Sequence, residues 1–484
     1  MEALNNYKPE RVLYYFEEIC KIPHGSSNTK QISDYLVSFA RSHDLKHMQD
    51  DWNNVLIKKP GTPGYEKAPT IILQGHMDMV CAKDPKVIHD FTKDPLHLTV
   101  TEDGYIKAEG TTLGGDDGIA IAYGLALLES SDIPHPPLEV LFTVDEEIGL
   151  LGADSFDCSV LKGKRMINLD SEEEGSIWVS CAGGLSMDSL LPVHRMKETG
   201  LQVEIVLSGL TGGHSGAEID KNRANANKLM GEFLFRLKEQ MAFGIADLYG
   251  GEKDNAISRN AGAILLIDED DHEDLYAFAS RFQDRINTEY AGTDENITVS
   301  INSNGLQTRD ILLPVSAEKV IFYLIHVPYG IVKMSGTIPG LVETSMNPGV
   351  MSLNCDAFRM TCSVRSSLNQ AKEDLKDKVI YLTEFLGGEC RIYGSYPAWQ
   401  YRKDSPLRDK MVSVYEDLYH NRPNVVAIHA GLECGLFYEK IDGLDCVSIG
   451  PNMKDIHTPG EALEIASVER VWEYLKKCLK ELKS

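Results

Sequence analysis

The spacing of apolar residues predicts that helices and strands alternate in the first part of the chain. Residues 9–20 carry apolar side chains at helical intervals, and the alanine- and leucine-rich segment 118–128 is also typical of a helix. The short runs at 70–73, 138–144 and 166–169 are typical of strands. This alternation predicts an α/β domain built on a mixed, largely parallel sheet.

The pattern changes near residue 184. Strands are expected at 201–207, 263–267, 297–302 and 351–364, the last two with antiparallel alternation. Helices are expected at 221–241, 272–290 and 369–385. This segment predicts a separate α+β domain placed inside the first one, a size within the normal range for domains.

The first pattern returns after about residue 393. Helices are expected at 406–419 and at the C-terminus, where Ser467 is the expected N-cap, and strands at 425–428 and 446–449. We find no internal repeat in the sequence. The predicted organisation is a catalytic domain, 1–184 and 393–484, interrupted by an inserted lid or dimerisation domain, 185–392.

Composition narrows the possible partners. The 48 basic and 73 acidic residues give a formal charge of −25, which argues against non-specific binding to nucleic acid or to an anionic membrane. No apolar run approaches the roughly 20 residues of a membrane span, and the first residues do not resemble a signal peptide. The ten cysteines are scattered without a metal-binding or disulfide spacing. We therefore expect a cytoplasmic protein with reduced thiols.

Acidic and histidine residues gather in four short clusters, three of them directly after predicted strands. The clusters lie at 74–78, 112–118, 143–149 and 168–172. In an open α/β sheet, ligands bind beyond the carboxyl ends of the strands. Each cluster alone has an ordinary explanation as a turn, a helix start or a solvated charge run. Their joint occurrence at strand ends and at a helix start predicts one shared crevice.

The residue types in these clusters suit a metal. Imidazole and carboxylate are zinc ligands, and many carboxylates in one place resist ionisation unless a cation balances them. His76 and Asp78, two apart on a strand, are expected to share a face, so that the carboxylate supports the histidine. Glu146 and Glu147 are adjacent and point differently, so one is expected to bind metal while the other holds a water. Together these features predict a two-metal hydrolase.

Six stretches resemble a known family. The sequence is similar to the co-catalytic dizinc aminopeptidases and aminoacylases, and most closely to their aminoacyl-histidine dipeptidases, also called cytosolic non-specific dipeptidases. The matching stretches are GHMDMV at 75–80, GTTLGGDDGIA at 110–120, FTVDEEIGLLGA at 142–153, INLDSEEEG at 167–175, SGLTGGHSGAEID at 208–220 and IHTPGE at 456–461.

The resemblance implies two zinc ions, although manganese or cobalt also suits the ligands. It implies that Asp116 bridges both ions, that His76 and Asp170 complete one site, and that Glu147 and His457 complete the other. The residues alone do not select His457, because a histidine beside Thr-Pro-Gly is typical of a loop.

The resemblance also assigns the catalytic groups. Glu146 is the expected general base, and Asp78 is expected to orient His76. In this family an aspartate at the position of Asp170 is typical of members that act on a free amino terminus.

Four further residues are candidate substrate contacts. By resemblance, His214 stabilises the oxyanion, from the same chain or from a dimer partner. Arg365 at a strand end is expected to bind a substrate carboxylate, with a surface ion pair as the alternative. Asn347 is a weaker candidate that also fits a plain turn. Glu433 is expected to pair with the substrate ammonium, with a structural role as the alternative.

These expectations define the predicted function. We predict a homodimeric metallopeptidase that cleaves dipeptides with free amino termini, including Xaa-His dipeptides. An aminoacylase or carboxypeptidase of the same fold is the alternative enzyme. A non-catalytic zinc-binding scaffold is the alternative outside enzymes, and retention of Glu146 with the full ligand set argues against it.

Overall fold

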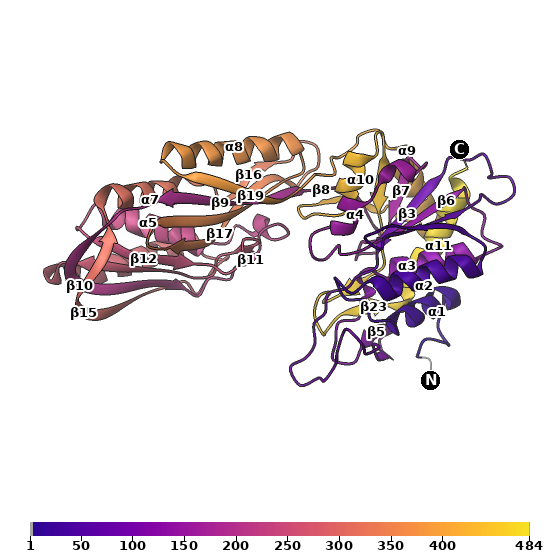
Figure 1. The fold of residues 1–484 in the computed structure, drawn as a ribbon, viewed down its shortest axis with the longest axis horizontal. Helices are drawn as coiled ribbons and strands as arrows, with labels where there is room; N and C mark the ends of the chain where they lie inside the picture. Colours follow the sequence, from indigo (N-terminus) through magenta and orange to yellow (C-terminus); the bar gives the residue numbers. More distant parts are fainter. Residues whose placement is uncertain (1–2, 484) are drawn as a thin grey trace. The chain divides into compact units, whose positions relative to one another are not determined.

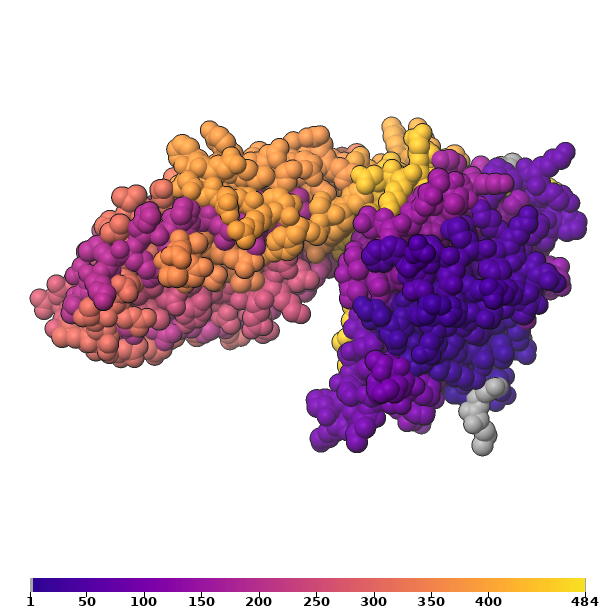
Figure 2. All heavy atoms as spheres, in the orientation of Figure 1, coloured from indigo at the N-terminus to yellow at the C-terminus, as the bar shows by residue number. Residues whose placement is uncertain are grey.

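The chain forms two compact units in the computed structural model, which describes residues 3–483. The first unit contains the chain up to Cys181, then 399–427, and then the chain from Leu432 onward. The second contains 182–398 together with 428–431. Figure 2 shows that the N-terminal (indigo) and C-terminal (yellow) segments both contribute to the first unit. Unlike the predicted organisation, the short segment 428–431 belongs to the second unit.

The first unit is an α/β structure, shown with its labels in Figure 1. Its helices are α1 (Glu10–Cys20), α2 (Lys30–Ser42), α3 (Gly115–Glu129), α4 (Leu151–Ser155), α9 (Pro406–Tyr419), α10 (Cys434–Lys440) and α11 (Ile465–Glu481). Its strands are β1 (Lys46–Gln49), β2 (Val55–Lys59), β3 (Ile71–His76), β4 (Leu98–Val100), β5 (Tyr105–Ala108), β6 (Leu138–Thr143), β7 (Arg165–Asn168), β8 (Ser176–Cys181), β20 (Asn424–Ile428), β21 (Asp445–Ser448), β22 (Met453–Lys454) and β23 (Ala462–Glu464).

An eight-stranded sheet organises this unit, in the order β1-β2-β6-β3-β7-β21-β8-β20. The central strands β6, β3, β7 and β21 are parallel, whereas β2 and β8 pair antiparallel with their neighbours. Ile71 and Leu73 of β3 point into the main core, and Ile72 is equally buried on the other face. Burial on both faces explains the continuous apolar runs of these strands. The predicted fold class is confirmed.

A small second sheet shapes the segment that carries His457. Strands β22 and β23 pair antiparallel, with Met453 opposite Leu463, and β23 also pairs with β5. His457 lies in the hairpin loop between β22 and β23, with a positive φ of 62°. Such backbone strain in a residue other than glycine persists only where the surrounding structure holds it.

The second unit is α+β. Its helices are α5 (Ala226–Leu237), α6 (His272–Glu289), α7 (Pro314–His326) and α8 (Asn369–Phe385). Its strands are β9 (Gly183–Pro192), β10 (Arg195–Ser208), β11 (Gly213–His214), β12 (Gly244–Gly250), β13 (Ala256–Ile257), β14 (Ala261–Ile267), β15 (Thr298–Leu312), β16 (Gly330–Met334), β17 (Val342–Leu353), β18 (Ala357–Ser366) and β19 (Glu389–Tyr396).

The large sheet of this unit repeats one topology. The elements β10-α5-β12-β14-α6-β15 give the strand order β15-β10-β14-β12, and β9-α7-β17-β18-α8-β19 give the order β19-β9-β18-β17. Both orders read last, first, third, second. The two repeats meet where Tyr249 and Gly250 of β12 pair with Ser352 and Met351 of β17. The architecture is therefore duplicated although the sequence shows no repeat.

Two helix starts differ from the predictions. The last helix begins at Ile465, directly after β23, so Ser467 is not its N-cap. The buried Ser467 hydroxyl instead accepts a hydrogen bond from the backbone N–H of Asn452 at 2.8 Å. Helix α5 begins at Ala226 rather than at 221, because Asn225 caps it by accepting from the N–H of Lys228. Within residues 3–483, no helix has both the length and the hydrophobicity needed to cross a bilayer.

Candidate metal centre

Parallel strands bring the predicted clusters to one edge of the first sheet. His76 is the last residue of β3, and the segments after β6 and β7 carry Glu146, Glu147 and Asp170. Because β6, β3, β7 and β21 run parallel, their carboxyl ends share one edge. Asp116 reaches the same place from the start of α3.

The five residues predicted as metal ligands converge around Asp116. One oxygen of Asp116, Oδ1, lies 3.1 Å from Nε2 of His76, and the other, Oδ2, lies 3.1 Å from Nε2 of His457. His76 Nε2 is also 3.5 Å from Oδ1 of Asp170, and His457 Nε2 is 2.9 Å from Oε1 of Glu147. The ligand atoms of His76, Asp116 and Asp170 lie within 4.8 Å of one another, and so do those of Asp116, Glu147 and His457. The two groups share a single carboxylate.

Asp78 stabilises this arrangement through hydrogen bonds to the neighbouring backbone. Its carboxylate accepts hydrogen bonds from the backbone N–H of Glu146 at 3.0 Å and of Glu147 at 3.3 Å, and from the Ser26 hydroxyl at 2.8 Å. Nδ1 of His76 lies 3.0 Å from the backbone carbonyl oxygen of Asp78 and 3.4 Å from its Oδ1. Asp78 therefore contacts the backbone of both glutamates as well as the histidine, a wider role than the sequence suggested.

Burial raises the pKa of two carboxylates in this cluster, Asp170 and Glu146. Burial, with repulsion from Asp116 and Glu147, raises the pKa of Asp170 to about 7 despite the nearby His76. Burial also raises the pKa of Glu146 well above its ordinary value. Although burial opposes ionisation of Asp116, its hydrogen bonds with both histidines hold its pKa below the usual range.

The donor set fits divalent cations. Among the described residues, three carboxylates pair with two histidines. His76 pairs with Asp116 and Asp170, and His457 pairs with Asp116 and Glu147. Buried carboxylates that repel one another are stabilised by a bound cation, and imidazole nitrogen with carboxylate oxygen is the donor set of zinc, manganese or cobalt sites.

A family model described as "Peptidase family M20/M25/M40" matches residues 72–481. The chain belongs to this family. It is 36% identical over 484 residues to the cytosol non-specific dipeptidase of Escherichia coli, covering 100% of this chain and 99% of that protein. The predicted similarity to this group of peptidases is confirmed.

Solved structures of the family agree with the fold. The aminoacylhistidine dipeptidase from Vibrio alginolyticus superposes with a TM-score of 0.91 at 33% identity, covering 99% of this chain and 97% of that chain. The aminopeptidase PepT from Bacillus cereus, at 16% identity and a TM-score of 0.57 over 99% of this chain and 100% of that one, supports the fold alone.

Glu433 of this M20 family protein lies beside the same cluster. It is fully buried, and its Oε2 accepts from Gln74 Nε2 at 2.5 Å and from the Thr143 hydroxyl at 2.7 Å. Its Oε1 has no hydrogen-bond partner among the described residues. Burial raises the pKa of Glu433 to about 7, although His76 opposes the shift. This side chain therefore has one buried oxygen available for a donor.

In the second unit, two of the predicted substrate residues meet around Gly216. The Nδ1 of His214 accepts from the backbone N–H of Gly216 at 3.2 Å and of Ala217 at 2.9 Å. A Cβ placed on Gly216 would lie 3.0 Å from Cε1 of His214 and 3.1 Å from Nε of Arg365. Arg365 is buried and donates from Nη1 to the Tyr396 hydroxyl at 2.9 Å.

His429 joins this pair, and the sequence did not single it out as a site residue. Its Nε2 lies 2.7 Å from the Ser345 hydroxyl. Burial and the neighbouring Arg365 lower its pKa to about 3. Burial and Arg365 also lower the pKa of His214. In the sequence, the only feature that pointed to His429 was its position in the glycine-containing loop 429–433.

Asn347 is held by backbone groups. Both of its N–H bonds are used, since Nδ2 donates at 2.8 Å to the carbonyls of Asp254 and Ala256. Its Oδ1 accepts from Asn225 at 3.1 Å. A carbonyl oxygen has a second lone pair, so a substrate contact through Oδ1 stays a prediction.

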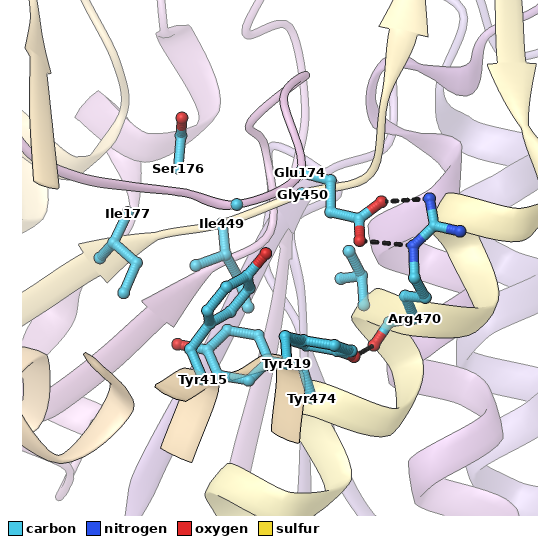
Figure 3. Close-up of a pocket in the computed structure, with 11 residues that line it drawn as sticks. Glu174, Ser176, Ile177, Tyr415, Tyr419, Ile449, Gly450, Arg470 and Tyr474 are labelled. Atoms are coloured by element: carbon cyan, nitrogen blue, oxygen red, sulfur yellow. Dashed lines mark hydrogen bonds and ion pairs between the residues drawn. The ribbon is translucent and has the colours of Figure 1, made fainter. Parts of the chain in front are cut away.

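A separate small pocket lies beside the segment that follows Asp170. Figure 3 shows Tyr415, Tyr419 and Tyr474 along one side of it, and Glu174 paired with Arg470 along another. Glu174 and Arg470 form two hydrogen bonds, of 2.6 and 2.7 Å. The lining of this pocket contains none of the predicted ligands, so we assign the chemistry to the cluster around Asp116.

Proposed function

We propose that this protein is a metal-dependent dipeptidase that hydrolyses dipeptides with a free amino terminus, including Xaa-His dipeptides. The observation that carries the proposal is the shared carboxylate of Asp116, whose two oxygens each lie 3.1 Å from a different histidine. The names of the Escherichia coli and Vibrio alginolyticus relatives supply the substrate class.

Two zinc ions are the proposed cofactors, with manganese or cobalt as substitutes that the same donors accept. His76, Asp116 and Asp170 would hold one ion, and Asp116, Glu147 and His457 the other. Such ions, when bound, polarise a carbonyl group and make water a nucleophile near neutral pH.

Glu146 is the proposed general base. It lies in the same cluster as His76 and Glu147, and burial raises its pKa, which strengthens it as a proton acceptor. It would take a proton from the attacking water and deliver it to the leaving amine. Asp78 would keep Glu146 in place through its hydrogen bond to the Glu146 backbone and would orient His76.

Complementary charge supports the substrate contacts. Glu433, with one free buried oxygen, would bind the substrate ammonium. Arg365 would bind the substrate carboxylate, and the adjacent His214 would donate to the oxyanion. Because Arg365 and His214 both lie next to Gly216, they would act on the same bound substrate. Asn347 would contribute a weaker contact.

The remaining proposals concern the cell and the assembly. We place the protein in the cytoplasm, as the name of the Escherichia coli relative indicates for that protein. A homodimer is proposed from the family resemblance, with contacts through the second unit. The charge of −25 disfavours nucleic acid or an anionic membrane as partners.

A dipeptide panel on metal-reconstituted protein tests the proposal. Unblocked dipeptides, including Xaa-His, should be cleaved, whereas N-acetyl amino acids and N-blocked dipeptides should not. Cleavage confined to N-acyl substrates would support the alternative aminoacylase or carboxypeptidase. The Glu146→Gln variant should bind both ions but lose roughly 10²- to 10⁴-fold in kcat. If the unmodified protein binds metal tightly but cleaves none of these substrates, the result would support the alternative of a non-catalytic zinc-binding scaffold.

A further inference from the structure

Glu461 is a buried carboxylate that the proposed reaction does not use. It lies four residues after His457 in the loop between β22 and β23, and it is 3% exposed. A buried carboxylate is costly unless hydrogen bonds or charges compensate it.

The compensation comes from the backbone around Asp116. Oε2 of Glu461 accepts from the N–H of Leu113 at 2.8 Å and of Gly114 at 3.2 Å. Oε1 accepts from the N–H of Gly115 at 2.8 Å and of Asp116 at 3.4 Å. One side chain therefore satisfies successive N–H groups at the start of α3, where a helix leaves its donors without partners and favours negative charge.

These bonds also decide what Glu461 does not do. Both of its oxygens point at amides, so neither is free to act as a metal ligand. The segment that it binds is constrained, because Gly114 has a φ of +67° and a Cβ there would lie 2.9 Å from Sδ of Met79. The carboxylate of Glu461 therefore binds a backbone conformation that requires glycine at position 114.

We propose that Glu461 is a positioning residue that sets the spacing of the shared ligand Asp116 and of His457. It is covalently part of the His457 hairpin and hydrogen-bonded to the Asp116 segment, so it fixes two ligand-bearing segments relative to each other. The inference rests on the proposed metal centre.

The other side of the same hairpin is tied to the segment that follows Asp170. The N–H of Met453 donates to the carbonyl of Glu172 at 3.0 Å, and the N–H of Glu174 donates to Oδ1 of Asn452 at 2.8 Å. Arg470 pairs with Glu174, as Figure 3 shows. With this side held, loss of the Glu461 contacts should displace the Asp116 side selectively.

The test compares Glu461→Gln with Glu139→Gln. Glutamine keeps the shape but replaces one accepting oxygen with an NH₂ group that faces N–H donors. Glu139 is the control: it is 2% exposed, lies in the first unit, and accepts through Oε2 from the backbone N–H of Lys162 and Gly163 at 2.8 and 2.9 Å, while its Oε1 pairs with Lys58. The measurements are Co²⁺ affinity by chelator competition, the visible spectrum of the Co²⁺ protein, and thermal unfolding of the metal-free proteins.

The expected result is a loss of Co²⁺ affinity of roughly 10- to 100-fold and an altered Co²⁺ spectrum for Glu461→Gln, with wild-type affinity and spectrum for Glu139→Gln. Wild-type affinity and spectrum in both variants would overturn the inference while leaving the metal centre intact. Failure of the unmodified protein to bind two ions would instead refute the proposed function.

Hydrogen exchange of the unmodified protein covers the case in which Glu461→Gln does not fold. The amides of residues 113–116 should exchange slowly, and more slowly still with Co²⁺ bound. Exchange as fast as in an exposed loop, with and without Co²⁺, would overturn the inference.

Discussion

The two units carry clusters of opposite charge, and burial acts on both in the same way. The acidic cluster of the first unit (Asp116, Glu146, Glu147 and Asp170) contains carboxylates whose pKa values burial raises, as for Glu146 and Asp170. The basic cluster of the second unit (His214, Arg365 and His429) contains histidines whose pKa values burial and Arg365 lower.

The carboxylates of the acidic cluster repel one another, although His76 and His457 pair with some of them. Burial keeps the two histidines of the basic cluster neutral, so Arg365 supplies the positive charge of that cluster. The acidic cluster is suited to cations, and the basic cluster to an anion such as a substrate carboxylate. The comparison predicts that the first unit responds to metals and the second to the charge of the substrate.

Asp116→Asn should have the largest effect. Removing the shared carboxylate charge should reduce the metal content below two ions per chain and, because bound metal supplies several kcal/mol of transition-state stabilisation, lower kcat/KM by at least about 10³-fold. Metal analysis and dipeptide kinetics measure both.

The control for Asp116→Asn is Asp445→Asn. Asp445 is a buried carboxylate of the same unit that accepts from the Ser405 hydroxyl and the Leu407 N–H. Its variant should keep both ions. Full metal content in Asp116→Asn would refute the shared-ligand assignment.

Arg365→Ala should come next. Hydrogen bonds to charged groups are worth about 1.5–3 kcal/mol, so KM for dipeptides should rise roughly 10- to 100-fold. An analogue with an amidated carboxyl terminus should be affected little. Arg359→Ala, on the same strand but paired with Asp188, should leave both KM values unchanged. An equal rise for the free and amidated substrates would count against the carboxylate role.

The sequence predicted the regular parts of this molecule well, because local patterns decide them. Helices α8 and α9 have the predicted bounds, 369–385 and 406–419. His76 follows a buried apolar run, so its place at a strand end was readable. The repeated topology of the second unit could not be predicted from the sequence. Two segments can form the same topology with similar patterns of buried positions, even when the residues at those positions differ.

Long-range contacts explain what the sequence missed. Ser467 looked like an N-cap, but its hydroxyl is used by Asn452, 15 residues away. Glu461 is the last residue of the stretch IHTPGE at 456–461, but the backbone N–H groups that it binds are 345 or more residues away in the sequence. His457 entered only through the family resemblance, for the same reason.

His429→Gln should change how stability depends on pH. In the folded protein its pKa is about 3, against an ordinary 6.5. Between these values the unfolded chain binds a proton that the folded chain does not, so stability falls as the pH drops below 6.5. When the pH is lowered from 7 to 4.5, the free energy of unfolding should decrease by roughly 1–3 kcal/mol less in the variant than in the wild type.

Urea unfolding at both pH values, with a chelator present in every sample, measures this difference. All other titrating groups are common to the two proteins and cancel. Identical pH dependence in variant and wild type would show that the pKa of His429 is not lowered by folding and that solvent reaches the basic cluster.

Asn347→Ala should have the smallest effect on substrate binding. A single neutral hydrogen bond through Oδ1 is worth about 0.5–1.5 kcal/mol, so KM should rise roughly 2- to 10-fold. The variant should also unfold more easily, because two backbone carbonyls lose their donor. Asn227→Ala separates the two effects: Asn227 is equally buried and donates to the carbonyls of Pro348 and Gly349. It should lose stability with KM unchanged. If Asn347→Ala also leaves KM unchanged, Asn347 belongs to the scaffold of the second unit and not to its substrate contacts.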